Sequence, residues 1–253
     1  MRSGILTADR YRAAPMSLAD RVAEIDWYHT LDLGDGVRTR GMFDIGPFVG
    51  EYRLPDDMSA MRALDIGMWD GFWAFEMERR GATDVIGLDI DSESELDFPP
   101  RRRPQSFPGI PRGTGFALAR EALGSAAQRV ACNVYDATPE KLGGQFDLVV
   151  CGSVLIHMRD HLLALERIAG LVKPGGLFIS AEEYEPRLDL LPFPTSRYLA
   201  DRDKAVVFWL PARRTWRRML WTAGFEDVRE VGRFKLRATA GWTVPHVVHH
   251  ARR

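Results

Sequence analysis

The sequence contains few cysteines and no surplus of positive charge, and each shortage disfavours a class of protein. Only 2 cysteines occur in 253 residues, Cys132 and Cys151, and both lie in runs typical of buried strands. Thiols so placed are more often core residues than a disulfide, which disfavours a disulfide-stabilised fold. The formal net charge is -1. Binding of nucleic acid through its phosphates would therefore have to come from a local basic patch.

Long apolar runs are also absent. No segment approaches the roughly 20 apolar residues that a membrane-spanning helix needs, and the opening stretch MRSGILTADRYRAAPMS has no apolar signal core. From these two absences we expect a cytoplasmic protein without membrane contact. Hydrophobic residues at 45% and charged residues at 27% are ordinary values for a globular chain.

What the sequence does contain is an alternation of short apolar runs with helical patterns. Helical patterns over 71–82, 115–125 and 160–172 separate strand-like runs over 62–68, 83–91, 129–136, 146–155 and 175–183. Such alternation favours parallel strands joined by crossover helices. We therefore predict an α/β fold with a doubly wound, Rossmann-like sheet, followed by a helix that ends near Gly224 and two strands that pair antiparallel at the sheet edge.

The predicted domain organisation is a cap segment over 1–60 and a main domain over 61–253. In the cap, Ser17 can begin a helix, and Asp35-Gly36 is a hairpin signal. Residues 92–115 contain five prolines and three consecutive arginines. This segment is longer than the connections normally found in such a fold. We interpret them either as a mobile functional loop or as a disordered surface insertion.

The turn after the first strand differs from a dinucleotide site. Asp65 and Gly67 stand where the strand ends, and Gly71 begins the next helix. A pyrophosphate needs the spacing G-x-G-x-x-G, whereas Met-Trp-Asp fills 68–70. Bulky and acidic residues better suit a ligand with an ammonium and a carboxylate, such as the methionyl end of S-adenosylmethionine. Asp89, about 20 residues further on, can accept hydrogen bonds from both ribose hydroxyls.

The order of these motifs resembles the class I S-adenosylmethionine-dependent methyltransferases. LDIGMWDGFW, GLDID, NVYDATPE and FDLVVCGSVLIHMRD follow one another, and LVKPGGLFI is typical of that family's fifth strand. More narrowly, WYHTLDLGDG and FWLPARRTWRRMLWTAGF resemble the branch that includes the carboxymethyltransferase of the tRNA wobble uridine. The resemblance runs from about Asp26 to the C-terminus. It implies a seven-stranded sheet with one antiparallel strand and S-adenosylmethionine at the carboxyl ends of the first strands.

The resemblance also implies a set of cofactor-binding residues, all at strand ends. They are Asp65, Gly67, Asp70 and Gly71 for the methionyl portion, with Trp69 in the same turn, Asp89 for the ribose, Ile90, Tyr135 and Asp136 for the adenine, and Gly152 and Ser153 near the transferring methyl group.

Two departures from the branch concern the cofactor. The glycine-rich pattern is reduced to Gly67 and Gly71, with Trp69 between them. The carboxymethyl-transferring branch has a tyrosine before the fourth-strand histidine that helps hold the extra carboxylate, but this chain has Ile156, which cannot hydrogen-bond. The chain also begins shortly before WYHT, which leaves little room for the extra N-terminal domain of the tRNA enzyme. We therefore expect ordinary S-adenosylmethionine.

Methyl transfer to a hydroxyl needs alignment and a proton acceptor. His157 directly follows the fourth strand and is the first candidate base, with a helix-capping histidine as the alternative. His29 is the second candidate, because its segment can fold over the cofactor; the alternative is that it only fixes that segment. Tyr28, Glu182 and Tyr184 are candidate acceptor-binding residues, the latter two because they follow the fifth strand, where exposed acids are common.

The nature of the acceptor is the least determined part of the prediction. We expect a small-molecule acceptor, such as one of secondary metabolism, that becomes O- or N-methylated. The alternatives are an RNA, suggested by the branch and by the runs RRR and ARRTWRR, and a catalytically silent cofactor-binding protein. No metal is expected, since His249 and His250 would point to opposite faces of a strand and the neighbouring His246 has no cysteine or acid nearby. The oligomeric state is left open.

Overall fold

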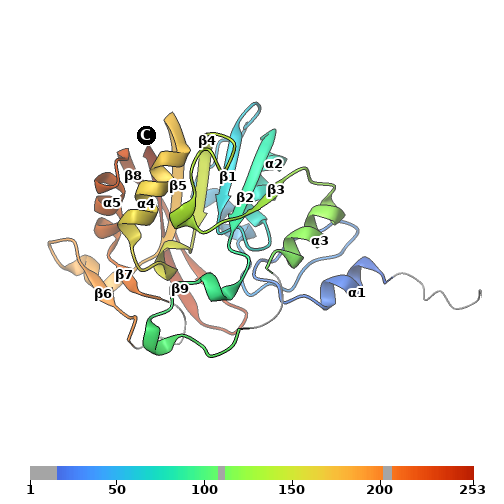
Figure 1. The fold of residues 1–253 in the computed structure, drawn as a ribbon, viewed down its shortest axis with the longest axis horizontal. Helices are drawn as coiled ribbons and strands as arrows, with labels where there is room; N and C mark the ends of the chain where they lie inside the picture. Colours follow the sequence, from blue (N-terminus) through green and yellow to red (C-terminus); the bar gives the residue numbers. More distant parts are fainter. Residues whose placement is uncertain (1–15, 108–111, 202–206) are drawn as a thin grey trace, which may run out of the picture.

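The computed structural model describes residues 16–107, 112–201 and 207–253 of the chain. Residues 1–15 of the predicted cap segment and 108–111 of the predicted loop lie outside the described residues. A twisted sheet forms the centre of the molecule, with helices on both faces (Figure 1). Among the residues that the structure describes, no helix has the length and apolar character needed to cross a bilayer.

The sheet has seven strands in the order β3-β2-β1-β4-β5-β9-β8. The first five are parallel, and β9 runs antiparallel to both of its neighbours. The predicted fold class is therefore confirmed. The strand bounds are β1 Arg62–Ile66, β2 Asp84–Asp89, β3 Gln128–Ala131, β4 Phe146–Gly152, β5 Val172–Glu183, β8 Glu226–Arg237 and β9 Thr243–Arg252, and a separate hairpin contains β6 Ser196–Tyr198 and β7 Trp209–Pro211.

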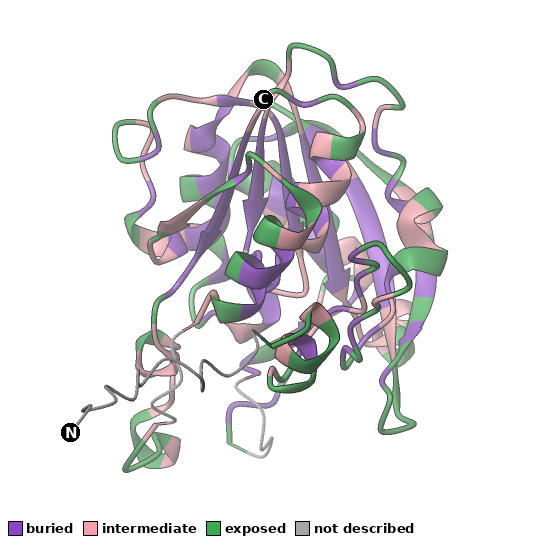
Figure 2. Cartoon of the chain, turned by 90° about the vertical axis from the view of Figure 1, so that its right-hand side faces the viewer, coloured by how far each residue is buried: buried purple, intermediate pink, exposed green. Residues whose placement is uncertain are grey.

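The helices cover the sheet because each buries one apolar side. Leu64 and Ile66 of β1 belong to the core cluster that includes α4, whereas the neighbouring Ala63 belongs to the cluster that includes α2, as expected for side chains that alternate along a strand. Figure 2 shows the inner strands almost wholly buried and the helices exposed on their outer sides. The helices are α1 Leu18–Ala23, α2 Phe72–Arg79, α3 Thr114–Leu123, α4 His161–Leu171 and α5 Arg213–Thr222.

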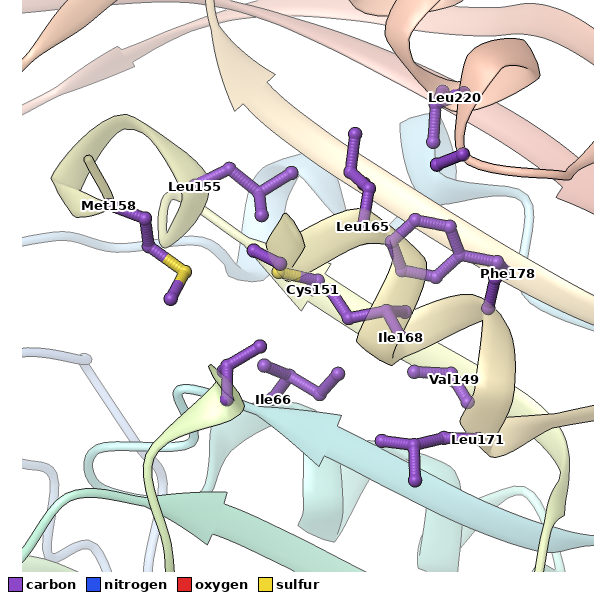
Figure 3. Packing of buried hydrophobic residues seen from close by; sticks show 14 of the residues in the cluster. Ile66, Val149, Cys151, Leu155, Met158, Leu165, Ile168, Leu171, Phe178 and Leu220 are labelled. Carbon is purple, nitrogen blue, oxygen red and sulfur yellow. The ribbon is translucent and has the colours of Figure 1, made fainter. Parts of the chain in front are cut away.

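The larger core cluster lies between the sheet and α4. Phe178 of β5, Val149 of β4 and Ile168 of α4 are fully buried and meet there with Cys151 (Figure 3). Both cysteines are free thiols. The prediction that Cys132 lies in a buried strand is wrong, because β3 ends at Ala131 and Cys132 is only partly buried.

The N-terminal segment follows the predicted local signals. The side chain of Ser17 accepts a hydrogen bond from the Asp20 N–H and begins α1. Asp35 and Gly36 both have positive φ, at 50° and 76°, and turn the chain back between Leu33 and Val37. Within the loop, Asp97 accepts hydrogen bonds from the Tyr135 hydroxyl at 2.7 Å and from the Arg159 N–H at 2.8 Å. The described part of the loop is therefore attached to the segments that follow β3 and β4.

Candidate cofactor and acceptor site

A cavity lies at the carboxyl ends of β1, β2 and β4, the place where parallel α/β sheets bind ligands. The structure brings most of the predicted site residues together around it. The predicted residues that line the cavity are Tyr28, His29, Asp65, Gly67, Trp69, Asp89, Ile90, Tyr135, Gly152, Ser153 and His157. Asp70, Gly71, Asp136, Glu182 and Tyr184 are not among its lining residues.

The end of β1 has a backbone path that requires glycine. Gly67 has φ +70°, and a Cβ there would collide with the Cγ2 of Val154. Gly71 has φ +88° and stands at the N-cap of α2, where a Cβ would lie 2.6 Å from the Phe116 ring. Trp69 adopts φ 46° between them. The two glycines of the sequence motif are therefore explained by a tight turn that brings the backbone close to the cavity.

Two buried acids stand at this turn, and only one of them faces the cavity. Asp65 accepts the Ala74 N–H at 3.0 Å, and burial raises the pKa of its carboxyl to about 7. The Asp70 carboxylate accepts the N–H groups of Tyr28 and His29 at 2.7 and 2.8 Å. The predicted contact of Asp70 with the methionyl portion is therefore not supported. Its carboxylate instead fixes the N-terminal segment against the sheet.

Asp89 holds the position predicted for a ribose-binding acid. Its carboxylate accepts the Trp69 N–H at 3.0 Å and the Ile90 N–H at 2.8 Å, which fixes its orientation in the cavity wall. Arg112 lies 3.3 Å from the same carboxylate and stacks on the Trp69 ring at 4.0 Å. Burial raises the pKa of Asp89, and the Arg112 guanidinium opposes that rise. The sequence did not single out Arg112, because no local pattern distinguishes it within a long loop.

The segment after β4 places a polar residue in the cavity and an apolar one in the core. His157, in the turn η5 (Leu155–His157), lines the cavity together with Met158. Ile156 is buried in the core cluster and does not line the cavity. The residue that replaces the branch's carboxylate-binding tyrosine is therefore apolar and also directed away from the site.

Ser153 is hydrogen-bonded to His246, a residue that sequence reasoning weighed only as a metal ligand. Its Oγ lies 2.8 Å from the Nε2 of His246, and the Nδ1 of His246 lies 3.2 Å from the Val244 carbonyl oxygen. A carbonyl can only accept, so Nδ1 carries the hydrogen and Nε2 accepts the serine hydroxyl. Burial lowers the pKa of His246 to about 4. The imidazole is therefore neutral at physiological pH, as its hydrogen bond with Ser153 requires.

The other two histidines of β9 serve different contacts. His250 Nε2 lies 2.8 Å from the Tyr52 carbonyl oxygen, and His249 lies in a hollow beside α5. Within the described residues there is no group of three or more histidine, cysteine or acidic side chains that could hold a metal ion.

Two candidate acceptor residues are placed differently from the prediction. Glu182 lies inside β5, which continues to Glu183, and is 1% exposed. Its Oε1 accepts the N–H groups of Val154 and Leu155 at 3.3 and 3.2 Å, and burial raises the pKa of its carboxyl to about 8. Tyr184 packs on the core cluster beside Arg213. Tyr184 follows β5 as predicted, whereas Glu182 lies inside the strand, and neither side chain lines the cavity.

The N-terminal segment closes one side of the cavity. Tyr28 packs on Trp69 with 5.0 Å between ring centroids. His29 is 5% exposed, its Nδ1 lies 3.9 Å from the Asp70 carboxylate, and burial lowers its pKa to about 3. Both side chains therefore face the cavity from a segment that Asp70 holds in place.

The fold and this cavity define a class I S-adenosylmethionine-dependent methyltransferase. Residues 38–230 match the family model described as a methyltransferase domain, and the chain belongs to that family. The class that the sequence motifs indicated, and its cofactor S-adenosylmethionine, are thereby confirmed.

Curated relatives point to one branch of this class. The tRNA U34 carboxymethyltransferase of Ectopseudomonas mendocina is 33% identical over 176 residues, which is 68% of this chain and 47% of that protein. The enzyme of the same name from Desulforapulum autotrophicum is 30% identical, over 66% of this chain and 45% of that protein. The chain thus spans about half the length of the curated relatives it matches.

Among solved structures, the N-terminal domain of EvdMO1 with S-adenosylhomocysteine bound has a TM-score of 0.61 and 18% identity, covering 93% of this chain and 95% of that domain. A methyltransferase from Mesorhizobium loti has a TM-score of 0.51 and 20% identity over 79% of this chain and 94% of its own. At these identities the likeness concerns the fold.

Proposed function

We propose that this methyltransferase transfers a methyl group to a nucleotide of an RNA of the tRNA class. The observation that carries the proposal is the set of curated relatives, which are 30 to 33% identical over two thirds of the chain and are named for tRNA U34. The small-molecule acceptor was the first expectation from the sequence, and these relatives favour the RNA alternative over it.

The cavity supports an assignment of its residues to the cofactor. Asp89 offers a fixed carboxylate to the ribose hydroxyls, and the close backbone approach at Gly67 suits the methionyl portion. Ile90 and Tyr135 form the wall where the adenine would lie. When bound, S-adenosylmethionine supplies a methyl group that its sulfonium already activates.

The group transferred is a methyl rather than a carboxymethyl group. A transferred carboxylate needs a hydrogen-bond donor at its binding position, and burying it without one is costly. Ile156 provides no donor and is buried in the core. Ordinary S-adenosylmethionine therefore fits this site better than its carboxylated form.

The remaining polar groups at the cavity wall suit an acceptor that loses a proton. Ser153 and His157 line the cavity near the end of β4, and Ser153 is backed by the neutral His246. Transfer to a hydroxyl or an N–H requires that the acceptor's proton leave, and these side chains can orient it and take it up.

A small hydroxyl-bearing molecule is the second candidate acceptor. The observation that favours it is the aromatic lining of the cavity, to which Tyr28, Tyr52, Trp69 and Trp73 all contribute. Small-molecule sites are typically lined by apolar and aromatic side chains with a few polar groups.

The test is methyl transfer from S-adenosylmethionine labelled in its methyl group to bulk tRNA from cells that lack this gene. The tRNA is then digested to nucleosides, and the labelled product is identified by mass spectrometry. We expect one methylated nucleoside, and the Asp89→Ala variant should not form it. Absence of labelled RNA together with labelling of a panel of small alcohols would overturn the RNA proposal in favour of the second candidate.

A further inference from the structure

Helix α5 has a strongly basic outer face that the cofactor site does not use. Its buried side consists of Thr215, Trp216 and Leu220. At about 100° per residue, Trp221 projects from the opposite side of the helix together with three of its four arginines, and Arg213 projects at the edge of that side, next to Leu220. Trp221 is 64% exposed. These arginines, which with Trp221 we name the α5 face, are Arg213, Arg214, Arg217 and Arg218.

The α5 face keeps most of its positive charge. Arg213 is paired with Asp189 at 2.6 Å and with Glu230 at 2.8 Å. Arg217 and Arg218 are exposed, and neither guanidinium has an acceptor within hydrogen-bond distance among the residues that the structure describes. Helix α5 itself contains no acid. A chain with a net charge of -1 thus concentrates unpaired positive charge on one helix.

Exposed aromatic rings extend this face toward the carboxyl ends of the strands. The β6–β7 hairpin lies below α5 at the left of Figure 1, and its Tyr198 and Trp209 are 51% and 36% exposed with 4.9 Å between ring centroids. The hairpin is joined to α5 by the hydrogen bond from the Ala212 N–H to the Thr195 carbonyl at 3.0 Å.

The same hairpin is joined to the cofactor cavity. The Phe208 N–H donates to the Ile156 carbonyl at 3.1 Å, and the next residue, His157, lines the cavity. Backbone hydrogen bonds therefore tie the strands β6 and β7 both to the start of α5 and to the segment that lines the cavity.

We propose that the α5 face and the exposed rings of Tyr198 and Trp209 form the docking surface for an unpaired segment of RNA. Guanidinium groups bind phosphates in a bidentate manner, and exposed aromatic rings stack on unpaired bases. Arg217 and Arg218 hold the phosphates, and Trp221 between them stacks on a base. This inference rests on the proposed RNA acceptor and adds the surface by which that RNA is held.

The test is binding of fluorescently labelled bulk tRNA, followed by anisotropy between about 50 and 200 mM salt. The double variant Arg217→Gln/Arg218→Gln should reduce the slope of log K against log salt by about 0.7 to 0.9 for each lost phosphate contact. Trp221→Ala should weaken binding about tenfold without changing that slope. The control Arg40→Gln/Arg120→Gln removes the same charge from exposed arginines outside this face and should leave the slope unchanged.

The outcomes distinguish a failure of the proposed docking surface from a failure of the proposed function. The docking surface would be ruled out if the α5 variants kept the wild-type affinity for tRNA and the wild-type salt slope, or if the control variant lost as much affinity. This holds even if tRNA is methylated. A loss of tRNA affinity in the α5 variants alone would support the docking surface. If the bound tRNA is not methylated, the proposal that tRNA is the acceptor would be wrong. All variants should keep the thermal shift that S-adenosylmethionine produces, which shows that they are folded.

Discussion

Ser153 and His246 are hydrogen-bonded at the wall of the cavity, with 2.8 Å between Oγ and Nε2. They are 93 residues apart in the chain and meet because β9 pairs with β5, next to β4. Ser153 has φ 57°, a conformation that residues other than glycine seldom adopt. We propose that this pair gives the acceptor's proton a route from the serine hydroxyl to the neutral imidazole.

We predict that Ser153→Ala and His246→Gln lower kcat without weakening cofactor binding. Glutamine can still accept the serine hydrogen bond, but it cannot take up a proton, so the loss of kcat measures proton uptake rather than geometry. General acid–base catalysis typically contributes about 100-fold or more. Methyl-transfer kinetics at saturating acceptor and titration calorimetry with S-adenosylmethionine measure the two effects. A large loss in His157→Ala with near wild-type kcat in both variants would assign the base to His157 instead.

We predict that Asp89→Ala removes most of the thermal stabilisation by S-adenosylmethionine. A ligand at about 100 times its Kd stabilises the native state by roughly 2.7 kcal/mol, which shifts the Tm by several degrees for a chain of this size. Thermal unfolding with and without the cofactor measures the shift. Asp91→Ala is the matched control, since Asp91 is exposed and pairs with Arg129. A full shift in Asp89→Ala would mean that the ribose lies elsewhere.

We predict that Gly67→Ala prevents cofactor binding and destabilises the fold. The positive φ and the contact of a Cβ with Val154 both oppose the substitution. Gly50→Ala is the control, because open space surrounds that glycine. Adding Val154→Ala to Gly67→Ala should recover part of the stability by removing the contact, although the φ penalty stays. Urea unfolding measures all four proteins, and no recovery in the double variant would contradict the proposed cause.

We predict that Glu182→Gln makes stability less dependent on pH. The folded pKa of Glu182, about 8, lies above the unfolded value near 4.5, so the native state binds the proton more tightly. The wild-type stability therefore falls as pH rises from about 4.5 to 8. The glutamine variant should match the wild type near pH 5 and exceed it by up to a few kcal/mol near pH 9.

Urea unfolding across that pH range checks this prediction, with the exposed Glu226→Gln as the control. Parallel pH curves for the wild type and Glu182→Gln would show that the carboxyl is ionised in the native protein. The difference between variant and wild type isolates Glu182 from Asp65 and Asp70, whose pKa values are also raised by burial.

The sequence by itself determined the sheet and the residues at its strand ends. Apolar runs located β1, β2, β4 and β5, because a buried parallel strand is apolar along its length. Gly67 and Gly71 were recognised because a tight turn is a local property of the backbone. Asp89 was recognised because its position after a strand places it at the carboxyl edge, where the cavity lies.

Only the tertiary structure decided which of these groups face the cavity and with what partners. Glu182 was expected as an exposed acid at the end of the fifth strand, but pairing with β9 continues to Glu183 opposite His246, and Glu182 is buried. Asp70 accepts hydrogen bonds from residues 41 and 42 positions earlier in the chain. Arg112 contacts Asp89, which is 23 positions away in the sequence. Such contacts depend on the order of strands in the sheet and on how loops pack against it, and no local periodicity or turn signal encodes them.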